Sequence, residues 1–298
     1  MIIIAGNHMV LSSHEKKIGD FYDQWYSKLI GLWGIEETLC YHNGLYGKGA
    51  RTFTETVYRM NDLVGTLLHL DNQKPHNILD AGSGLGGTSL YLAKHYPTSK
   101  FIGITIAPHQ VELANFCAKE RNIANASFSH QSYLNTSFSD NYFDGIFALE
   151  SSSYAEEYHL FLDEMHRILK PRGTLVVIDG FRTDKPLNSF MEKLYDDFSR
   201  GFGASHLPFH SDYTAYLTKK GFQDIITQNI SKQVRRSIYS VALVCMPFYF
   251  YDIIRRRLHI QKPMEDSTIS FSRGVNISAG LLGLYGAIQY YATSAVKQ

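Results

Sequence analysis

The length, composition and charge of the chain limit the kinds of protein it can be. Its 298 residues suffice for one large α/β domain with an elaborated cap, or for two small domains. Hydrophobic residues make up 44% and charged residues 19%, as in an ordinary globular protein. The net charge of +1 gives no reason to expect a nucleic-acid partner. The 3 cysteines lie far apart without C-x-x-C spacing, which argues against a zinc ribbon or a redox dithiol and favours a cytoplasmic location.

The first part of the chain is predicted to form a helical cap. Apolar residues alternate with charges at helical spacing over 13–32, and a second amphipathic helix is expected over 51–70. Between them, glycines mark a loop over 41–47. We therefore assign 1–70 to an N-terminal helical cap.

Strands and helices alternate after the cap. This order is typical of a parallel sheet with helices on both faces, so the predicted fold is α/β, with a doubly wound Rossmann-like sheet. The core is expected over 71–231, and its last strand lies within 281–298. The predicted strands cover 77–81, 101–106, 126–130, 143–149, 174–179, 222–229 and 287–295, and the predicted helices cover 87–96, 108–121, 157–169, 187–200 and 211–219.

An apolar run lies before the last predicted strand. Residues 237–254 are mostly aliphatic and aromatic, with arginines at both ends. Pro247 and Asp252 interrupt the run, so it falls short of the about 20 apolar residues that span a membrane. It is also too apolar for an exposed loop. We expect 232–280 to be an apolar, helical lid insertion, with peripheral contact between 237–254 and a membrane as the alternative.

A glycine-rich turn follows the first predicted strand. Gly82, Gly84 and Gly87 also fit the dinucleotide pattern G-x-G-x-x-G, so the glycines alone do not identify a ligand. Asp80 would repel a pyrophosphate but would suit the amino group of a cationic ligand. The strand over 101–106 ends without the acidic residue that a dinucleotide ribose requires. The turn therefore favours S-adenosylmethionine over a dinucleotide or over a turn without any cofactor.

Four segments of the chain resemble class I S-adenosylmethionine-dependent methyltransferases. They are 78–86, 103–110, 142–151 and 169–175, and the resemblance extends over about residues 20–298. The chain looks most like the branch that methylates sterols, tocopherols and related isoprenoids, which also resembles the cyclopropane fatty-acid synthases. The first and last segments are specific for the fold and the cofactor, but they say little about the methyl acceptor.

The resemblance implies positions for S-adenosylmethionine. Asp80 would orient the glycine turn and bind the ammonium group of the ligand through a charge-assisted hydrogen bond. Thr105 and Gln110 would bind the ribose hydroxyls, which an acidic residue does in many other methyltransferases. Ser132 departs from the more common Asp, which leaves its contact with the adenine amino group open. The residues implied for the cofactor are Asp80, Gly82, Ser83, Gly84, Thr105, Ile106, Gln110, Gln131, Ser132, Tyr133, Leu149, Glu150, Trp33 and Tyr41.

Three side chains are candidates for catalysis. Glu150 follows a predicted strand at the end where parallel sheets carry their chemistry, and would face the transferred methyl group or act as a base. His42 lies in the cap, and Tyr22 would close over the sulfonium. No metal is expected, because the histidines beside Pro208 have no carboxylate or cysteine at metal-binding spacing.

The aromatic content of the chain bears on the acceptor. The 20 tyrosines and 18 phenylalanines, with the apolar insertion, favour a bulky, lipid-like molecule. The leading expectation is C-methylation of an isoprenoid, terpenoid or sterol-like acceptor, since aromatic faces stabilise the carbocation that forms. The alternatives are N- or O-methylation of an aromatic, alkaloid or polyketide product, a methyltransferase-like cyclase, and a binding module. The expected partner is a hydrophobic small molecule, with a homodimer and membrane association left open.

Overall fold

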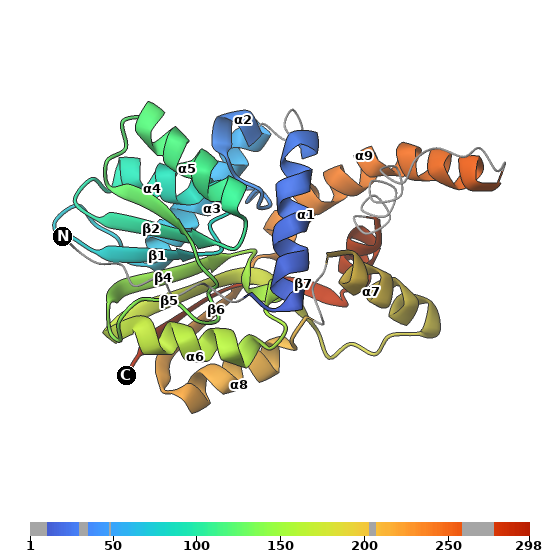
Figure 1. Ribbon diagram of the computed structural model, residues 1–298. Coiled ribbons are helices and arrows are strands. Elements are labelled where there is room, and N and C mark those ends of the chain that lie inside the picture. Colours follow the sequence, from blue (N-terminus) through green and yellow to red (C-terminus); the bar gives the residue numbers. More distant parts are fainter. Residues whose placement is uncertain (1–10, 30–34, 48, 203–206, 258–276) are drawn as a thin grey trace.

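The protein is an α/β structure in which one sheet lies between layers of helices (Figure 1). The computed structural model describes residues 11–29, 35–47, 49–202, 207–257 and 277–298. The helices are α1 (Ser13–Leu29), α2 (Ile35–Thr38), α3 (Phe53–Leu67), α4 (Gly87–His95), α5 (Pro108–Glu120), η1 (Ser152–Tyr154), α6 (Tyr158–Ile168), α7 (Ser189–Phe202), α8 (His210–Lys220), α9 (Ser231–Arg257) and a helix over 277–285. The strands are β1 (Asn77–Ala81), β2 (Lys100–Thr105), β3 (Ala126–His130), β4 (Phe143–Leu149), β5 (Leu169–Arg182), β6 (Phe222–Asn229) and β7 (Ile288–Lys297).

The order of the strands creates a natural ligand crevice. The strands follow one another across the sheet as β3-β2-β1-β4-β5-β7-β6. β1 pairs in parallel with both β2 and β4, whereas β7 runs antiparallel between β5 and β6. The chain therefore moves outward from β1 to β3 and then returns to the other side of β1 with β4. In open α/β sheets, ligands bind outside the carboxyl ends of the strands at such a reversal.

Alternate residues of the central strands face two different apolar layers. Leu79 and Ile146 pack with residues of α6 and α8 on one face of the sheet. Ile78 and Phe147, their neighbours in sequence, pack with residues of α3 and α4 on the other face. Successive side chains of a strand point to opposite faces, so a continuous apolar run is buried on both sides. The first turns of α9 contribute Val234 to the second layer.

The N-terminal cap lies across the carboxyl ends of the strands, where α1 crosses the end of the sheet (Figure 1). The backbone of α1 comes close to the end of β2: a Cβ on Gly19 would approach the carbonyl oxygen of Ile106 to 2.9 Å. The absence of a side chain at this position lets the helix cover the crevice closely.

The structure confirms most of the predicted elements and changes two of them. Four strands, 77–81, 126–130, 143–149 and 222–229, have the predicted bounds. β5 is longer than the predicted 174–179, because its second half pairs with β7 as far as Arg182. The sheet was expected to be parallel, and the antiparallel β7 departs from that expectation, since apolar periodicity does not encode the direction of a strand.

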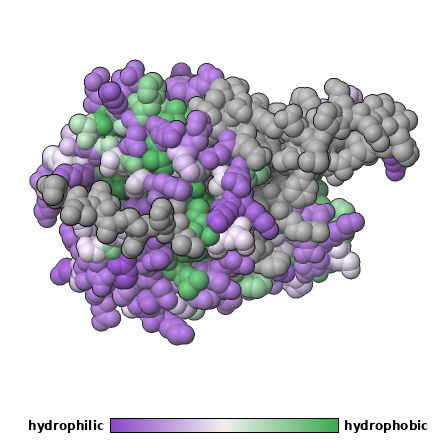
Figure 2. All heavy atoms as spheres, in the orientation of Figure 1, coloured by the Kyte–Doolittle hydropathy of each residue, from purple (hydrophilic) through white to green (hydrophobic). Residues whose placement is uncertain are grey.

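The surface is uneven in polarity. Hydrophilic residues dominate the lower part of the view, over α6 and α8 (Figure 2). Several large apolar side chains of α9 are exposed, namely Leu243, Phe250, Tyr251 and Ile254. In the described ranges, no helix has the length and apolar character needed to cross a membrane. The predicted insertion 232–280 covers nearly all of α9 and the first part of the helix over 277–285, while 258–276 lies outside the described residues.

Candidate functional site

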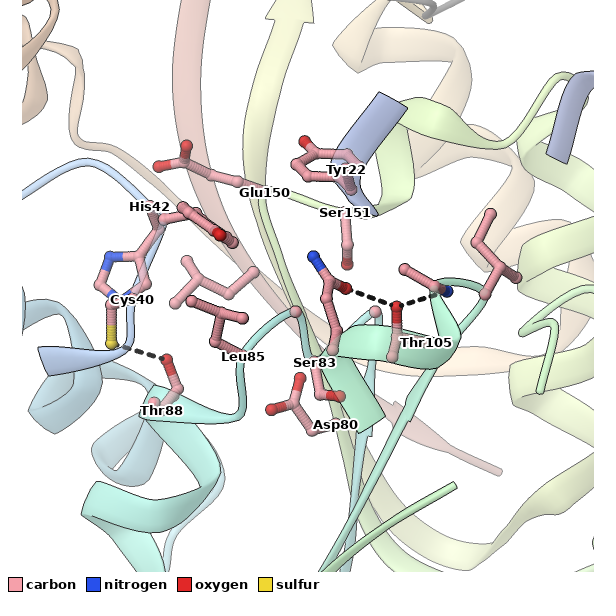
Figure 3. A pocket seen from close by; sticks show the side chains of 18 of the residues that line it. Tyr22, Cys40, His42, Asp80, Ser83, Leu85, Thr88, Thr105, Glu150 and Ser151 are labelled. Atoms are coloured by element: carbon pink, nitrogen blue, oxygen red, sulfur yellow. Dashed lines mark hydrogen bonds between the residues drawn. The ribbon is translucent and has the colours of Figure 1, made fainter. Parts of the chain in front are cut away.

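A cavity of about 180 Å³ lies at the carboxyl ends of β1, β2 and β4. This volume far exceeds the ~15 Å³ that one water molecule needs. Asp80, Ser83 and Thr105 lie on one side of the cavity, and Tyr22 and Glu150 lie on the opposite side (Figure 3). The cavity therefore occupies the crevice that the strand order creates.

The glycine turn after β1 offers backbone and an unsatisfied hydroxyl to a ligand. Gly82 and Gly84 have φ values of +91° and +52°, in the left-handed region that favours glycine. A Cβ on Gly82 would come within 2.4 Å of the Ser151 Cβ. The Ser83 Oγ is buried, and the described residues give it no hydrogen-bond partner. Because buried polar atoms are normally paired, the Ser83 hydroxyl indicates a site for a ligand atom.

Asp80 is a buried carboxylate in the wall of the cavity. Only 3% of its surface is exposed, and Ser89 Oγ donates a hydrogen bond of 2.7 Å to its Oδ2. Burial raises the pKa of Asp80 to about 7, and the Ser89 hydroxyl opposes this rise. Within the described ranges it forms no salt bridge. A ligand ammonium group would stabilise the ionised carboxylate, whereas a pyrophosphate would not. The residues of this wall therefore fit S-adenosylmethionine.

Thr105 and Gln110 form a fixed pair where β2 leads into α5. Thr105 Oγ1 donates a hydrogen bond of 2.8 Å to Gln110 Oε1, and the Ala107 amide donates one of 3.3 Å to Thr105 Oγ1 (Figure 3). Both side chains are buried and both line the cavity. The binding of the ribose hydroxyls by these two residues stays a prediction.

The loop after β3 differs from the expectation at one residue. Gln131 and Tyr133 line the cavity, but Ser132 does not. The Ser132 hydroxyl donates a hydrogen bond to the Glu15 carboxylate of α1 and accepts one of 3.0 Å from the Leu134 amide. Neighbouring side chains of an extended chain point to opposite sides, so Ser132 faces α1 while Gln131 and Tyr133 face the cavity. This geometry does not favour the expected contact between Ser132 and adenine, which stays a prediction.

Glu150 is a carboxylate held in an unusual conformation at the end of β4. Its φ of +53° lies in the left-handed region, which is rare for Glu and is found mostly at functional sites. Asn43 donates from its backbone amide at 2.7 Å and from its Nδ2 at 3.1 and 3.0 Å to the two carboxylate oxygens. Burial raises the pKa of Glu150 to about 7, against the effect of these donors. A carboxylate with a pKa near neutrality is suited to accept a proton.

His42 supports the loop that carries Asn43. Its Nδ1 lies 3.0 Å from the Asn43 carbonyl oxygen and its Nε2 lies 3.0 Å from Asn61 Oδ1, and a neutral ring donates a hydrogen bond to one of these two oxygens. Burial lowers the pKa of His42, so the ring is neutral at physiological pH. Since both ring nitrogens lie against protein oxygens, the geometry favours a structural role for His42, and its catalytic role stays a prediction.

Tyrosine rings form the wall of the cavity next to Glu150. The hydroxyls of Tyr22 and Tyr154 lie 2.6 Å apart, and their ring centroids are separated by 5.8 Å. Tyr41 packs against Tyr22 with a centroid distance of 6.1 Å. Burial raises the pKa of Tyr22 to about 12, so its ring stays neutral. Trp33, the other aromatic residue expected in this wall, lies outside the described residues.

The structure brings together most of the residues expected at the site. Those that line the cavity are Tyr22, Tyr41, His42, Asp80, Gly82, Ser83, Gly84, Thr105, Ile106, Gln110, Gln131, Tyr133, Leu149 and Glu150. The cavity also has lining residues outside the expected cofactor-binding and catalytic set, namely Ile18, Leu39, Cys40, Leu85, Gly87, Thr88, Ala107, Ser151 and Tyr154. Asn43 was missed as well, because a polar residue in a glycine-containing loop has no local signal for its distant partner. The described lining includes no residue of 232–280, so the role of this insertion as a lid stays a prediction.

Comparison with known protein sequences identifies relatives of the chain. The Methyltransferase domain family matches residues 72–229, more than half of the chain. The 2-methyl-6-phytyl-1,4-hydroquinone methyltransferase of Synechocystis is 32% identical over 220 residues, which cover 69% of this chain and 67% of the relative. The tocopherol O-methyltransferase of Arabidopsis thaliana is 25% identical over 236 residues, covering 74% and 66%. The ajmaline N-methyltransferase of Rauvolfia serpentina is 26% identical over 182 residues, covering 58% and 61%. The chain thus spans about two thirds of the length of these relatives.

Comparison with solved structures supports the same fold. The cyclopropane synthase MmaA2 of Mycobacterium tuberculosis matches with a TM-score of 0.79 at 18% identity, covering 96% of this chain and 98% of that one. The geranyl diphosphate C-methyltransferase of Streptomyces coelicolor, solved with S-adenosyl-L-homocysteine, matches with a TM-score of 0.73 at 16% identity, covering 97% and 99%. At these identities the likeness concerns the fold. Together with the sequence match and the fit of the cavity, it establishes that the chain belongs to the family of S-adenosylmethionine-dependent methyltransferases.

Proposed function

We propose that the protein methylates a carbon atom of a lipophilic, isoprenoid-like small molecule. The observation that carries the proposal is Glu150, a half-buried carboxylate with a pKa near neutrality at the end of β4, opposite Asp80 and Ser83 in the same cavity (Figure 3). S-adenosylmethionine, when bound, supplies a methyl group that is already activated. The remaining tasks of the protein are to orient the acceptor, exclude water and accept one proton.

Glu150 is the proposed proton acceptor. The electron pair of an acceptor double bond would form the new carbon–carbon bond while the bond between the methyl carbon and the cofactor sulfur breaks and its electron pair stays on the sulfur. The acceptor then carries the positive charge and must lose a proton. A carboxylate oxygen of Glu150 takes that proton. The three hydrogen bonds from Asn43 hold the carboxylate in place and favour its ionised form beforehand. Tyr290 supports the same arrangement, because its hydroxyl accepts a hydrogen bond of 3.2 Å from Asn43 Nδ2.

The aromatic wall suits the cation that forms on the acceptor. Tyr22, Tyr133 and Tyr154 line the cavity, and burial raises the pKa of each hydroxyl, so the rings are neutral. A neutral ring face stabilises a nearby cation by roughly 0.5–2 kcal/mol. The cap also covers part of the cavity with the apolar side chains of Ile18 and Leu39, which favours the exclusion of water.

The names of the relatives support a prenylated acceptor. The Synechocystis relative acts on a phytyl-substituted hydroquinone, and the Arabidopsis relative acts on tocopherol. The ajmaline and norajmaline N-methyltransferases of Rauvolfia serpentina favour a second candidate, N-methylation of an alkaloid-like amine. In that reaction Glu150 would take the proton that the methylated nitrogen releases.

Labelled methyl transfer distinguishes the two candidates. The purified protein is incubated with S-adenosylmethionine carrying a ¹³C methyl group and with a prenylated hydroquinone, a sterol or an indole alkaloid. Mass spectrometry detects the methylated product, and carbon NMR identifies the atom that carries the label. We expect a new carbon–carbon bond on the prenylated acceptor. Methylation of the alkaloid nitrogen alone would contradict the first candidate and support the second.

The Glu150→Gln variant tests the role of the carboxylate. The amide keeps the shape of the side chain but cannot take the proton, so kcat should fall about 10²–10⁴-fold. The affinity for S-adenosylmethionine, measured by calorimetry, should stay close to that of the unchanged protein. A kcat within twofold of the unchanged protein would exclude Glu150 as the base.

A further inference from the structure

The outer half of α9 exposes a row of large apolar side chains. Leu243, Phe250 and Ile254 have 63%, 56% and 56% of their surface exposed. On an ideal helix with 3.6 residues per turn, these positions would fall within about 40° of one another and span about 17 Å, with Pro247 between Leu243 and Phe250. Tyr251, which is 62% exposed, lies beside the row. A contiguous apolar strip of this kind on the surface indicates a contact with another molecule or with a membrane.

Basic residues continue the same row at both ends. Lys232 and Arg236 lie 11 and 7 residues before Leu243, and Arg257 lies three residues after Ile254, so all three fall on the same face. Each of them is exposed. α9 contains six basic residues and one acidic residue, a net charge of +5, in a chain whose net charge is +1. The rest of the chain is therefore net −4, and the positive charge is concentrated on this helix.

We propose that this face of α9 binds the surface of an anionic lipid bilayer, with the helix lying in the plane of the interface. Such a helix buries its apolar face about 5–10 Å deep, while long basic side chains reach the anionic headgroups. The outer half of α9 extends beyond the sheet and away from α6 and α8 (Figure 1). A symmetric contact between two copies of α9 is disfavoured, because it would bring two basic helices together.

The inference deepens the proposed function and rests on it in one respect. An isoprenoid-like acceptor dissolves in a bilayer rather than in water. α1, which closes the cavity, lies at the same end of the sheet as the projecting half of α9 (Figure 1). Docking through α9 therefore brings the cavity next to the phase that holds the acceptor.

Co-sedimentation with vesicles tests the proposal on the full-length protein. Phosphatidylcholine vesicles with and without phosphatidylglycerol are compared for the unchanged protein and for the combined variant Leu243→Ser, Phe250→Ser and Ile254→Ser. The matched control combines Phe116→Ser and Leu160→Ser, which remove apolar side chains that are 59% and 47% exposed on α5 and α6. We expect binding to the phosphatidylglycerol vesicles, a loss of at least about tenfold in the α9 variant, and unchanged binding in the control. Added salt should weaken the binding of the unchanged protein.

Two outcomes overturn the proposal. One is the absence of binding to phosphatidylglycerol vesicles, and the other is equal binding by the α9 variant and the control. A smaller oligomer in the α9 variant, without any vesicle binding by the unchanged protein, would assign the face to a second copy instead. Thermal unfolding shows whether each variant is folded. A parallel methyl-transfer assay with a detergent-dispersed acceptor separates the two hypotheses, because vesicle binding without methyl transfer would refute only the proposed function.

Discussion

Replacing Asp80 by Asn tests whether a buried carboxylate holds the amino group of the cofactor. The Asp80→Asn change keeps the size of the side chain and allows a hydrogen bond with Ser89, but it removes the charge. A hydrogen bond to a charged group contributes about 1.5–3 kcal/mol. The Kd for S-adenosylmethionine should therefore rise about ten- to hundredfold.

The pKa of Asp80 predicts how this affinity depends on pH. Burial raises the pKa from 3.8 to about 7, so the ligand-free carboxyl is largely protonated below that pH. An ammonium group binds the ionised form, and binding below about pH 7 must therefore release a proton. The Kd of the unchanged protein should rise by up to about tenfold for each pH unit below 7, whereas the Asp80→Asn protein should lack this dependence.

The same raised pKa predicts that the ionised Asp80 carboxylate destabilises the ligand-free protein, although it strengthens cofactor binding. Because the folded protein binds the Asp80 proton more tightly than the unfolded chain, its stability falls as pH rises from about 3.8 to about 7. Above about pH 7, the raised pKa lowers the free energy of unfolding by at most about 4 kcal/mol. The ligand-free Asp80→Asn protein should therefore have a higher Tm than the unchanged protein at pH 8.

Calorimetry between pH 6 and 8 and thermal unfolding at pH 8 measure these effects. The variant should bind the cofactor more weakly and yet unfold at a higher temperature. This opposite pair of changes is not expected from a variant that is merely damaged. Equal Kd values and equal Tm values for the two proteins would refute the role assigned to Asp80.

Three further changes test the rest of the site. Asn43→Ala removes side-chain hydrogen-bond donors that hold Glu150, so the pKa of this carboxyl should rise further. The acidic limb of the kcat–pH profile should then move upward by about one pH unit or more. An unchanged profile would argue that Asn43 does not control the protonation of Glu150. Gly82→Ala should cost more than about 2 kcal/mol of stability, because its Cβ would meet a serine side chain at 2.4 Å. Gly49→Ala is the control in chemical denaturation, since Gly49 has a similar φ of +94° with open space around it. Equal losses of unfolding free energy in the two variants would show that backbone strain, and not the contact with Ser151, causes the loss at Gly82. Tyr22→Phe keeps the ring and should change kcat by less than about threefold, whereas Tyr22→Ala should lower kcat at least about tenfold if the ring face stabilises a cation.

Local sequence patterns predict the central strands of the sheet and the glycine turn after β1. The strands over 77–81 and 143–149 could be predicted because continuous apolar runs are buried on both faces of the sheet. Gly82 and Gly84 marked the turn because their backbone conformations suit glycine, and Asp80 indicated a cationic ligand through its charge alone. These signals are local, since each depends on residues that are neighbours along the chain.

The tertiary structure decided the features that depend on distant residues. Asn43 and Glu150 are 107 positions apart, and no local pattern links a loop amide to the carboxylate that it holds. The same reason applies to Ser132, whose hydroxyl donates a hydrogen bond to Glu15 of α1. It also applies to the antiparallel direction of β7. Apolar periodicity predicts that a segment is buried, but the partner of a polar side chain and the direction of a strand follow only from how the whole chain packs.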